Sequence, residues 1–198
     1  MMTPDLNPPS SSFQLILDTA EQLIREKGCN KTTLQDIMDR SGLSKGAIYH
    51  YVSGKDELFG RILISKMEKI NENFHTAVTH AASGDASSPI QMIVGRMMIN
   101  TDNESVTNKI FTYLLSQSEN PKIAKILTEL YEYTHQLSIQ WIQRGQQAGA
   151  IPSHIDAVKL STLFNIFTYG LRTHRIIVQD EEKFGFDDIF NVIFKSLQ

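Results

Sequence analysis

The feature that most constrains the fold is a pair of short amphipathic segments that meet at Gly42. In the first segment, Thr33 and Asp36 form the pattern of a capping box, and apolar residues follow at helical spacing. Ser44 can cap the second segment, which we expect to be helical through Tyr51. Because glycine adopts the left-handed conformation without steric cost, Gly42 permits a tight turn between the two. This arrangement is typical of a helix-turn-helix.

The rest of the chain also places apolar residues at helical spacing, and no stretch alternates over the length of a strand. We therefore predict an all-α fold. The expected helices cover 13–27, 33–41, 44–51, 55–82, a segment after Pro89, 106–117, 121–147, a segment opened by a capping box at Ser153-x-x-Asp156 and ending near Ile177, and 186–197.

Length and composition limit the kind of protein. At 198 residues the chain can hold a small N-terminal head and a larger body. It has one cysteine, so no intrachain disulfide is possible, and no apolar run approaches the roughly 20 residues that span a bilayer. Met1–Ser12 lacks Lys and Arg, so we expect no signal peptide, a disordered tail over 1–11, a cytoplasmic location and no membrane partner.

The second short segment offers side chains suited to reading base pairs. Lys45 can donate to guanine O6 and N7, and the Ala47 methyl can meet a thymine methyl. Gly46 is small enough to let the backbone approach the duplex. Other donors are expected to bind phosphates, which set register without specifying sequence. These are Thr32, Thr33, Ser44, Tyr49, His50 and Lys55.

Net charge alone does not suggest nucleic acid, because the chain carries −3 overall. Between Gly28 and Lys55 the basic residues outnumber the acidic ones by a local excess of two. This patch is small. The prediction of DNA binding therefore depends on the geometry of the two segments rather than on electrostatics.

A longer pattern at fixed spacings surrounds these segments. It consists of Ile16-Leu17-x-x-Ala20, Lys27-Gly28, Thr32-Thr33-Leu34-x-x-Ile37, Ser41-Gly42-Leu43-Ser44-Lys45-Gly46-Ala47-Ile48-Tyr49-x-Tyr51 and Lys55-x-x-Leu58. This pattern resembles the DNA-binding domain of the TetR family of bacterial regulators. The resemblance implies that Tyr49 and Lys55 contact phosphates and that 45–47 lie at base-reading positions. Cys29 and Val52 stand where the family usually has aromatic residues, which we expect to affect packing.

The resemblance also implies a helical C-terminal body that dimerises and encloses a ligand pocket. We accordingly expect a DNA-binding domain over 12–58, with a linking helix from about 55, and a ligand-binding and dimerisation domain over 59–198. The last two helices are the dimer candidates, although their periodicity fits an intrachain core equally well. Their apolar stripes are Val158, Phe164, Phe167, Leu171, Ile189, Phe190, Ile193, Phe194 and Leu197.

Apolar and aromatic residues of the middle helices are candidates for the ligand pocket, because such pockets are mostly apolar with a few polar groups. Each of them also suits an ordinary core. They are Met92, Met97, Phe111, Tyr113, Leu114, Tyr131, His135, Trp141, Phe164 and Phe167. This composition suggests an apolar or amphipathic effector.

Together these features predict a transcriptional regulator that binds a palindromic double-stranded operator as a homodimer and acts as a ligand-responsive repressor. An enzyme is the main competing class, but no catalytic triad, phosphate-binding loop or acid pair at a telling spacing is present. We therefore predict no catalytic residue, no metal site and no cofactor. A third alternative is a helical protein-interaction module without DNA binding.

Overall fold

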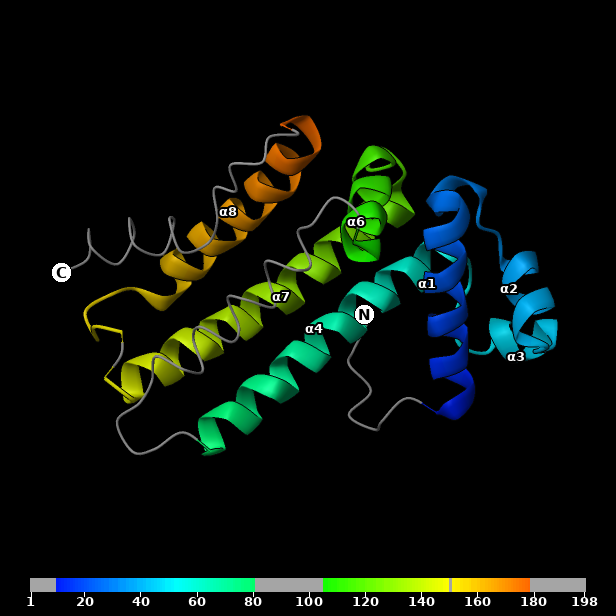
Figure 1. Cartoon of the computed structure of the whole chain (residues 1–198). Coiled ribbons are helices and arrows are strands. Elements are labelled where there is room, and N and C mark those ends of the chain that lie inside the picture. The colour runs from blue at the N-terminus through cyan, green and yellow to red at the C-terminus, as the bar shows by residue number, and fades with distance from the viewer. Residues whose placement is uncertain (1–9, 81–104, 150, 179–198) are drawn as a thin grey trace. The chain divides into compact units, whose positions relative to one another are not determined.

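The computed structural model describes residues 10–80, 105–149 and 151–178, and every regular element within them is a helix (Figure 1). The all-α prediction is confirmed. The helices are α1 (Ser11–Lys31), α2 (Leu34–Ser41), α3 (Lys45–Tyr49), α4 (Lys55–His80), α6 (Val106–Ser116), α7 (Pro121–Gln147) and α8 (Ala157–Ile177). The helices expected after Pro89 and over 186–197 lie outside the described residues. None of the described helices is both long enough and apolar enough to cross a membrane.

The chain divides into two compact units. The first consists of Met1–Glu68 with Val106–Thr134, and the second of Lys69–Ser105 with His135–Gln198. The first unit thus contains the expected DNA-binding segment 12–58 and adds α6, the beginning of α4 and the first part of α7. Helices α4 and α7 each contribute residues to both units.

The core of the first unit brings the short helices together with α1, which contacts both α2 and α6. Helices α1, α2 and α3 lie together in Figure 1. The residues that are completely buried there come from every helix of the unit's N-terminal part and from α6. They include Ile16, Ile24, Ile37, Ile48, Leu58, Phe59, Ile62, Ile110 and Leu114. Burial of each such aliphatic side chain contributes about 1.5–3 kcal/mol of hydrophobic free energy.

Helix α1 is kinked at Gly28, which has φ 78° and ψ 166°. This region of backbone space is essentially restricted to glycine. The sequence predicted the end of the helix at this glycine, and the structure instead continues the element to Lys31 after the kink. Upstream of it, the buried carboxylate of Glu21 pairs with Lys66 of α4 at 2.6 Å, which ties α1 to α4.

The core of the second unit joins α7 and α8. Ile142, Ile151, Leu160 and Leu171 are buried together, and Ile155, Ala157, Phe164 and Phe167 pack against them. Helix α8 begins with Asp156 as its N-cap, whose side chain accepts hydrogen bonds from the backbone of Val158 and Lys159. The predicted capping box had assigned that role to Ser153, and the structure corrects the cap by three residues.

Candidate nucleic-acid interface

The turn between α2 and α3 forms as the local sequence predicts. The Thr33 hydroxyl accepts from the Asp36 backbone at 3.1 Å, and the Asp36 carboxylate accepts from the Thr33 backbone at 2.8 Å. This reciprocal pair is the predicted capping box. Gly42 has φ 71°, and its N–H donates to the Met38 carbonyl at 3.0 Å. The left-handed glycine therefore ends α2 and turns the chain toward α3.

Helix α3 is anchored on one side and open on the other. Ser44 is its N-cap and accepts from the Ala47 N–H at 3.2 Å, while the side chain of Ile48 is completely buried. The regular helix ends at Tyr49, two residues before the predicted end at Tyr51. The chain then leaves through a turn in which the Tyr51 N–H donates to the Ile48 carbonyl at 3.0 Å.

The solvent side of α3 carries most of the predicted reading residues. Ser44, Lys45, Gly46, Tyr49 and His50 are exposed, and Ala47 is half-buried. Tyr49 keeps 46% of its surface accessible. The ammonium of Lys45 lies 5.6 Å from the centroid of the Tyr49 ring, within the range of a cation–π contact. We call these exposed and half-buried residues the α3 face (Ser44–His50 without Ile48).

The hydroxyl groups of Thr32 and Thr33, which were expected to donate to phosphates, donate to protein acceptors in the structure. Thr32 is completely buried, and its hydroxyl donates to the Gly28 carbonyl at 2.9 Å, because the kinked end of α1 folds over it. Thr33 is exposed, but its hydroxyl donates to Asp36 Oδ2 at 2.6 Å. Both hydroxyl hydrogens are therefore used inside the helix-turn-helix.

Lys55 is also placed differently from the expectation. It is half-buried at the start of α4, and its ammonium contacts the backbone carbonyls of Cys29 and Asn30, at the end of α1 after the kink, and of Thr32. The exposed lysine of the predicted interface is therefore Lys45 rather than Lys55. Tertiary packing decides which distant backbone atoms a side chain contacts, so the spacing of residues in the sequence could not predict these contacts of Lys55.

Sequence reasoning missed a contact that supports the end of α3. The Tyr51 hydroxyl and Ser10 Oγ are 2.7 Å apart, and the Tyr51 ring stacks on Phe13 with centroids 4.9 Å apart. Ser10 is also the N-cap of α1. Tyr51 therefore fastens the exit of the recognition segment to the beginning of α1. The pairing of two aromatic residues 38 positions apart leaves no local sequence signal.

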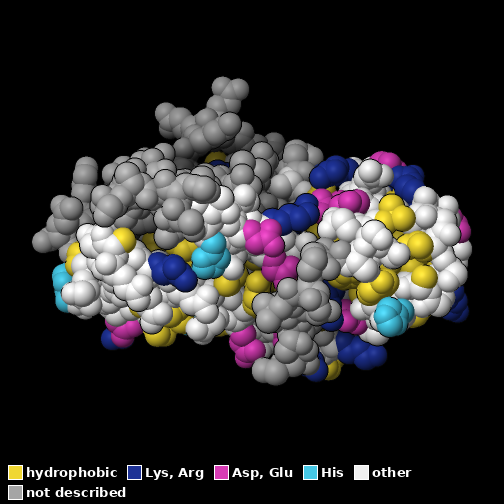
Figure 2. Space-filling model, turned by 90° about the horizontal axis from the view of Figure 1, so that it is seen from below, with side chains coloured by type: hydrophobic (Ala, Val, Ile, Leu, Met, Phe, Trp, Pro, Cys, Tyr) yellow, Lys and Arg dark blue, Asp and Glu magenta, His cyan; other side chains and the backbone are white. Residues whose placement is uncertain are grey.

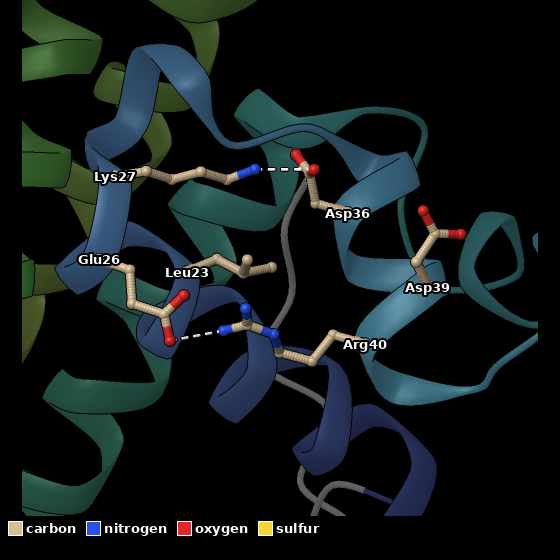
Figure 3. A pocket seen from close by; sticks show the side chains of 6 residues that line it. All are labelled: Leu23, Glu26, Lys27, Asp36, Asp39 and Arg40. Carbon is tan, nitrogen blue, oxygen red and sulfur yellow. Dashed lines mark hydrogen bonds and ion pairs between the residues drawn. The ribbon is translucent and has the colours of Figure 1, made fainter.

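Ion pairs on both sides of a small pocket brace α1 against α2 (Figure 3). Lys27 Nζ lies 2.7 Å from Asp36, and Arg40 lies 2.6 Å from Glu26, with Leu23 between the two pairs. The pocket has a volume of about 350 Å³ and is lined by Leu23, Glu26, Lys27, Asp36, Asp39 and Arg40. The hydrogen bond from Lys27 and those from Thr33 lower the pKa of Asp36 to about 2. The carboxylate is thus charged at neutral pH. It accepts a hydrogen bond in the capping box and forms the ion pair with Lys27 that links α1 to α2.

Charges on the face drawn in Figure 2 are mixed. Lys and Arg side chains are interspersed with Asp and Glu and do not form a broad basic field. This agrees with the small excess of basic residues in the sequence.

The residues expected to line a ligand pocket fall in different places. Met92 and Met97 lie outside the described residues. Phe111, Tyr113, Leu114 and Tyr131 belong to the first unit, whereas His135, Trp141, Phe164 and Phe167 belong to the second. In the second unit, the Trp141 indole donates to Asn71 Oδ1 at 2.9 Å, and His135 Nε2 is 3.2 Å from the Thr162 hydroxyl.

The apolar residues of α8 that were expected at the dimer interface differ in their exposure within one chain. Leu171 is buried in the core of the second unit, and Phe164 and Phe167 pack against that core. Of the predicted residues on α8, Val158 alone is exposed, at 52%. The apolar residues that face solvent are instead Leu163, Ile166, Ile176 and Ile177. Ile189, Phe190, Ile193, Phe194 and Leu197 lie outside the described residues.

Comparison with known proteins agrees with this geometry. Residues 16–62, which contain α2 and α3, match the family model for bacterial regulatory proteins of the tetR family. The chain is 24% identical over 169 residues to an uncharacterized HTH-type transcriptional regulator of Bacillus subtilis (strain 168), YfiR, covering 85% of this chain and 81% of that protein. It is 25% identical over 167 residues to the HTH-type transcriptional repressor KstR2 of Rhodococcus jostii (strain RHA1), covering 78% and 77%.

Solved structures share the fold. GusR of Salmonella enterica superposes with a TM-score of 0.66 at 20% identity and covers 97% of each chain. The fatty acid degradation regulator FadR from Bacillus halodurans superposes with a TM-score of 0.63 at 17% identity, covering 86% of this chain and 87% of that one. The helix-turn-helix segment thus lies within the residues, 16–62, that match the family model for bacterial regulatory proteins of the tetR family, and the chain as a whole is similar to HTH-type transcriptional regulators.

Proposed function

We propose that the chain is a ligand-responsive repressor that binds a palindromic operator as a homodimer. The observation that carries the proposal is the α3 face: an N-capped helix, anchored by buried Ile48, presents Ser44, Lys45 and Tyr49 to solvent. A helix held this way in a helix-turn-helix enters the major groove with its N-terminal residues on base edges.

The roles proposed within the face follow from chemistry and exposure. Lys45 reads guanine, and Gly46 and Ala47 allow close approach and contact with a thymine methyl. Ser44, Tyr49 and His50 bind phosphates, since each keeps a polar group at the surface. Although Ser44 accepts a hydrogen bond as N-cap, its hydroxyl hydrogen remains available to donate.

A second copy of the chain is the proposed occupant of the exposed apolar face of α8. Leu163, Ile166 and Ile177 are 39%, 61% and 73% exposed and recur at helical spacing, with Ile166 and Ile177 on a different side of the helix from buried Leu171. The repeated half-sites of a palindrome require a two-fold partner, and an isologous contact along α8 supplies one. Residues 189–197 remain part of this proposed interface.

The proposed effector is an apolar or amphipathic small molecule that binds in the helical body. It acts by binding the DNA-competent and incompetent states with different affinity. To shift the populations of the two states from 1:99 to 99:1, the effector's binding free energies for these states must differ by about 5.5 kcal/mol. The aromatic residues Trp141, Phe164 and Phe167 of the second unit are the proposed apolar contacts.

Selection of duplexes from a random-sequence library by the full-length chain tests the proposal. We expect enrichment of an inverted repeat whose half-sites are about 10 base pairs apart, or a multiple of that distance. Tyr49→Ala is the test variant and should lose the selected duplex, whereas Gln140→Ala, an exposed change on α7, is the control. Enrichment of no duplex, or full retention by Tyr49→Ala, would contradict the assignment.

A further inference from the structure

The ammonium group of Lys55 lies within hydrogen-bonding distance of three carbonyl oxygens of the protein itself. Its Nζ lies 3.3 Å from the Cys29 carbonyl oxygen and 3.4 Å from those of Asn30 and Thr32. An ammonium has three N–H donors, and these three acceptors can occupy all of them. Lys55 therefore binds the backbone that leads from α1 into the capping box of α2.

The ring of Tyr113, on α6, covers another side of the Lys55 ammonium group. Its ring centroid lies 5.1 Å from Lys55 Nζ, and its hydroxyl donates to Asp56 Oδ1 at 2.9 Å. Phe59 supports the ring edge-on, with centroids 5.5 Å apart. Burial and the bond to Asp56 raise the pKa of Tyr113 to about 12, so the hydroxyl stays a donor at neutral pH.

We propose that Tyr113 is a positioning residue for DNA binding, which acts through Asp56 and Lys55 to hold the backbone of 29–32, from the kinked end of α1 to the start of α2. This inference rests on the proposed function, in which the α3 face reads DNA. In it Lys55 does not contact phosphate, contrary to its expected role, because its donors are directed at the carbonyls of 29–32. We call this arrangement the Lys55 clamp (Lys55, Asp56 and Tyr113).

The clamp can influence α3 through a short path of backbone. The segment it holds runs directly into Thr33, the N-cap of α2, and α2 ends at Gly42, from which α3 begins. A shift of the clamped segment would therefore move α2 and α3 together. Since half-site reading demands a fixed orientation of α3, a loosened connection lowers affinity without removing any contact with DNA.

Salt dependence separates a positioning lysine from a phosphate-binding one. Loss of one phosphate contact reduces the slope of log K against log salt by about 0.9. With a duplex selected by the wild-type chain and titrated with potassium chloride, Lys55→Met should weaken binding about tenfold and leave the slope unchanged. Lys45→Met is the matched control. Lys45 is exposed on the α3 face, where its charge would displace counterions from the bound duplex, so its removal should make the slope shallower.

Tyr113 is tested by a graded pair of variants. Tyr113→Phe loses the hydrogen bond to Asp56 but keeps the ring over Lys55, whereas Tyr113→Leu loses both. We expect about fivefold weaker binding for the first and a larger loss for the second, both with the wild-type slope. Equal affinity of Tyr113→Leu and wild type would overturn the proposal.

Cys29 provides a readout that does not involve DNA. It is the single cysteine of the chain, it is 7% exposed, and burial raises the pKa of its thiol to about 11. Its reaction with a disulfide reagent should be slow in the wild type. Tyr113→Phe and Lys55→Met should accelerate it about fivefold by freeing the clamped segment, and Lys45→Met should leave the rate unchanged.

The two readouts distinguish the possible failures. A shallower salt slope and an unchanged Cys29 rate in Lys55→Met would show a phosphate contact and reject the clamp. If the wild type selects no duplex, the proposed function fails, and the Cys29 rates still decide whether the clamp holds the segment. An unchanged rate in both Lys55→Met and Tyr113→Phe would reject the positioning role.

Discussion

Ile48 and Tyr49 are neighbours on a five-residue helix, and their substitution by alanine should have opposite consequences. Ile48 is completely buried, whereas Tyr49 is 46% exposed. Ile48→Ala removes three carbons at about 0.8 kcal/mol each and leaves a cavity beneath α3. The total loss of unfolding free energy should be about 2–5 kcal/mol. Tyr49→Ala removes a half-exposed ring and should cost under about 1 kcal/mol.

Denaturant unfolding at a fixed protomer concentration measures both values, since a dimer's stability depends on concentration. DNA binding is then measured at a temperature where each variant is folded. We expect Tyr49→Ala to bind much more weakly while remaining nearly as stable as the wild type. A loss below about 0.5 kcal/mol for Ile48→Ala, or equal destabilisation by the two changes, would refute the division of α3 into an anchored and an open side.

Three further predictions address the turn, the brace and the dimer. Gly42→Ala should lower the unfolding free energy by about 1–2 kcal/mol. The cause is backbone strain alone, because φ is 71° and no atom lies within 4 Å of an added Cβ. Gly46→Ala, at an ordinary helical position, should not lower the unfolding free energy in this way. The pKa of Asp36 is lowered from 3.8 to about 2, so its stabilisation is complete above pH 4 and is lost as the pH falls toward 2. Asp36→Asn should therefore reduce the change in unfolding free energy between pH 4 and pH 2. An unchanged pH dependence would contradict a stabilising role for the Asp36 carboxylate and its ion pair with Lys27. Ile166→Asp should dissociate the proposed dimer in sedimentation experiments without unfolding the protomer, and a dimer that persists in this variant would contradict an interface along α8.

The local parts of the interface could be predicted from the sequence because their causes are local. The capping box of Thr33 and Asp36 depends on residues three apart, and the turn depends on one glycine with positive φ. Ser44 as N-cap and Ile48 as anchor follow from the same short-range rules. Helical periodicity likewise predicted the all-α fold, since it needs no knowledge of which helices meet.

The remaining parts depend on contacts between distant segments. The hydroxyl of Thr32 turns inward because α1 kinks at Gly28, and Lys55 reaches back over more than twenty residues to the same region. On α8, the stripe containing Leu171 and the opposite stripe containing Ile166 are both apolar. Periodicity shows that a helix has an apolar side, but packing decides which side is covered.

The base preference of Lys45→Met is the decisive measurement, because we propose that the α3 face reads base edges and that Lys45 binds guanine. Duplex selection with this variant should retain the inverted repeat but lose discrimination at one guanine position of each half-site, by about 1–3 kcal/mol relative to the wild type. An identical base preference at every position of the half-site would contradict the account, because the exposed lysine of α3 would then read nothing.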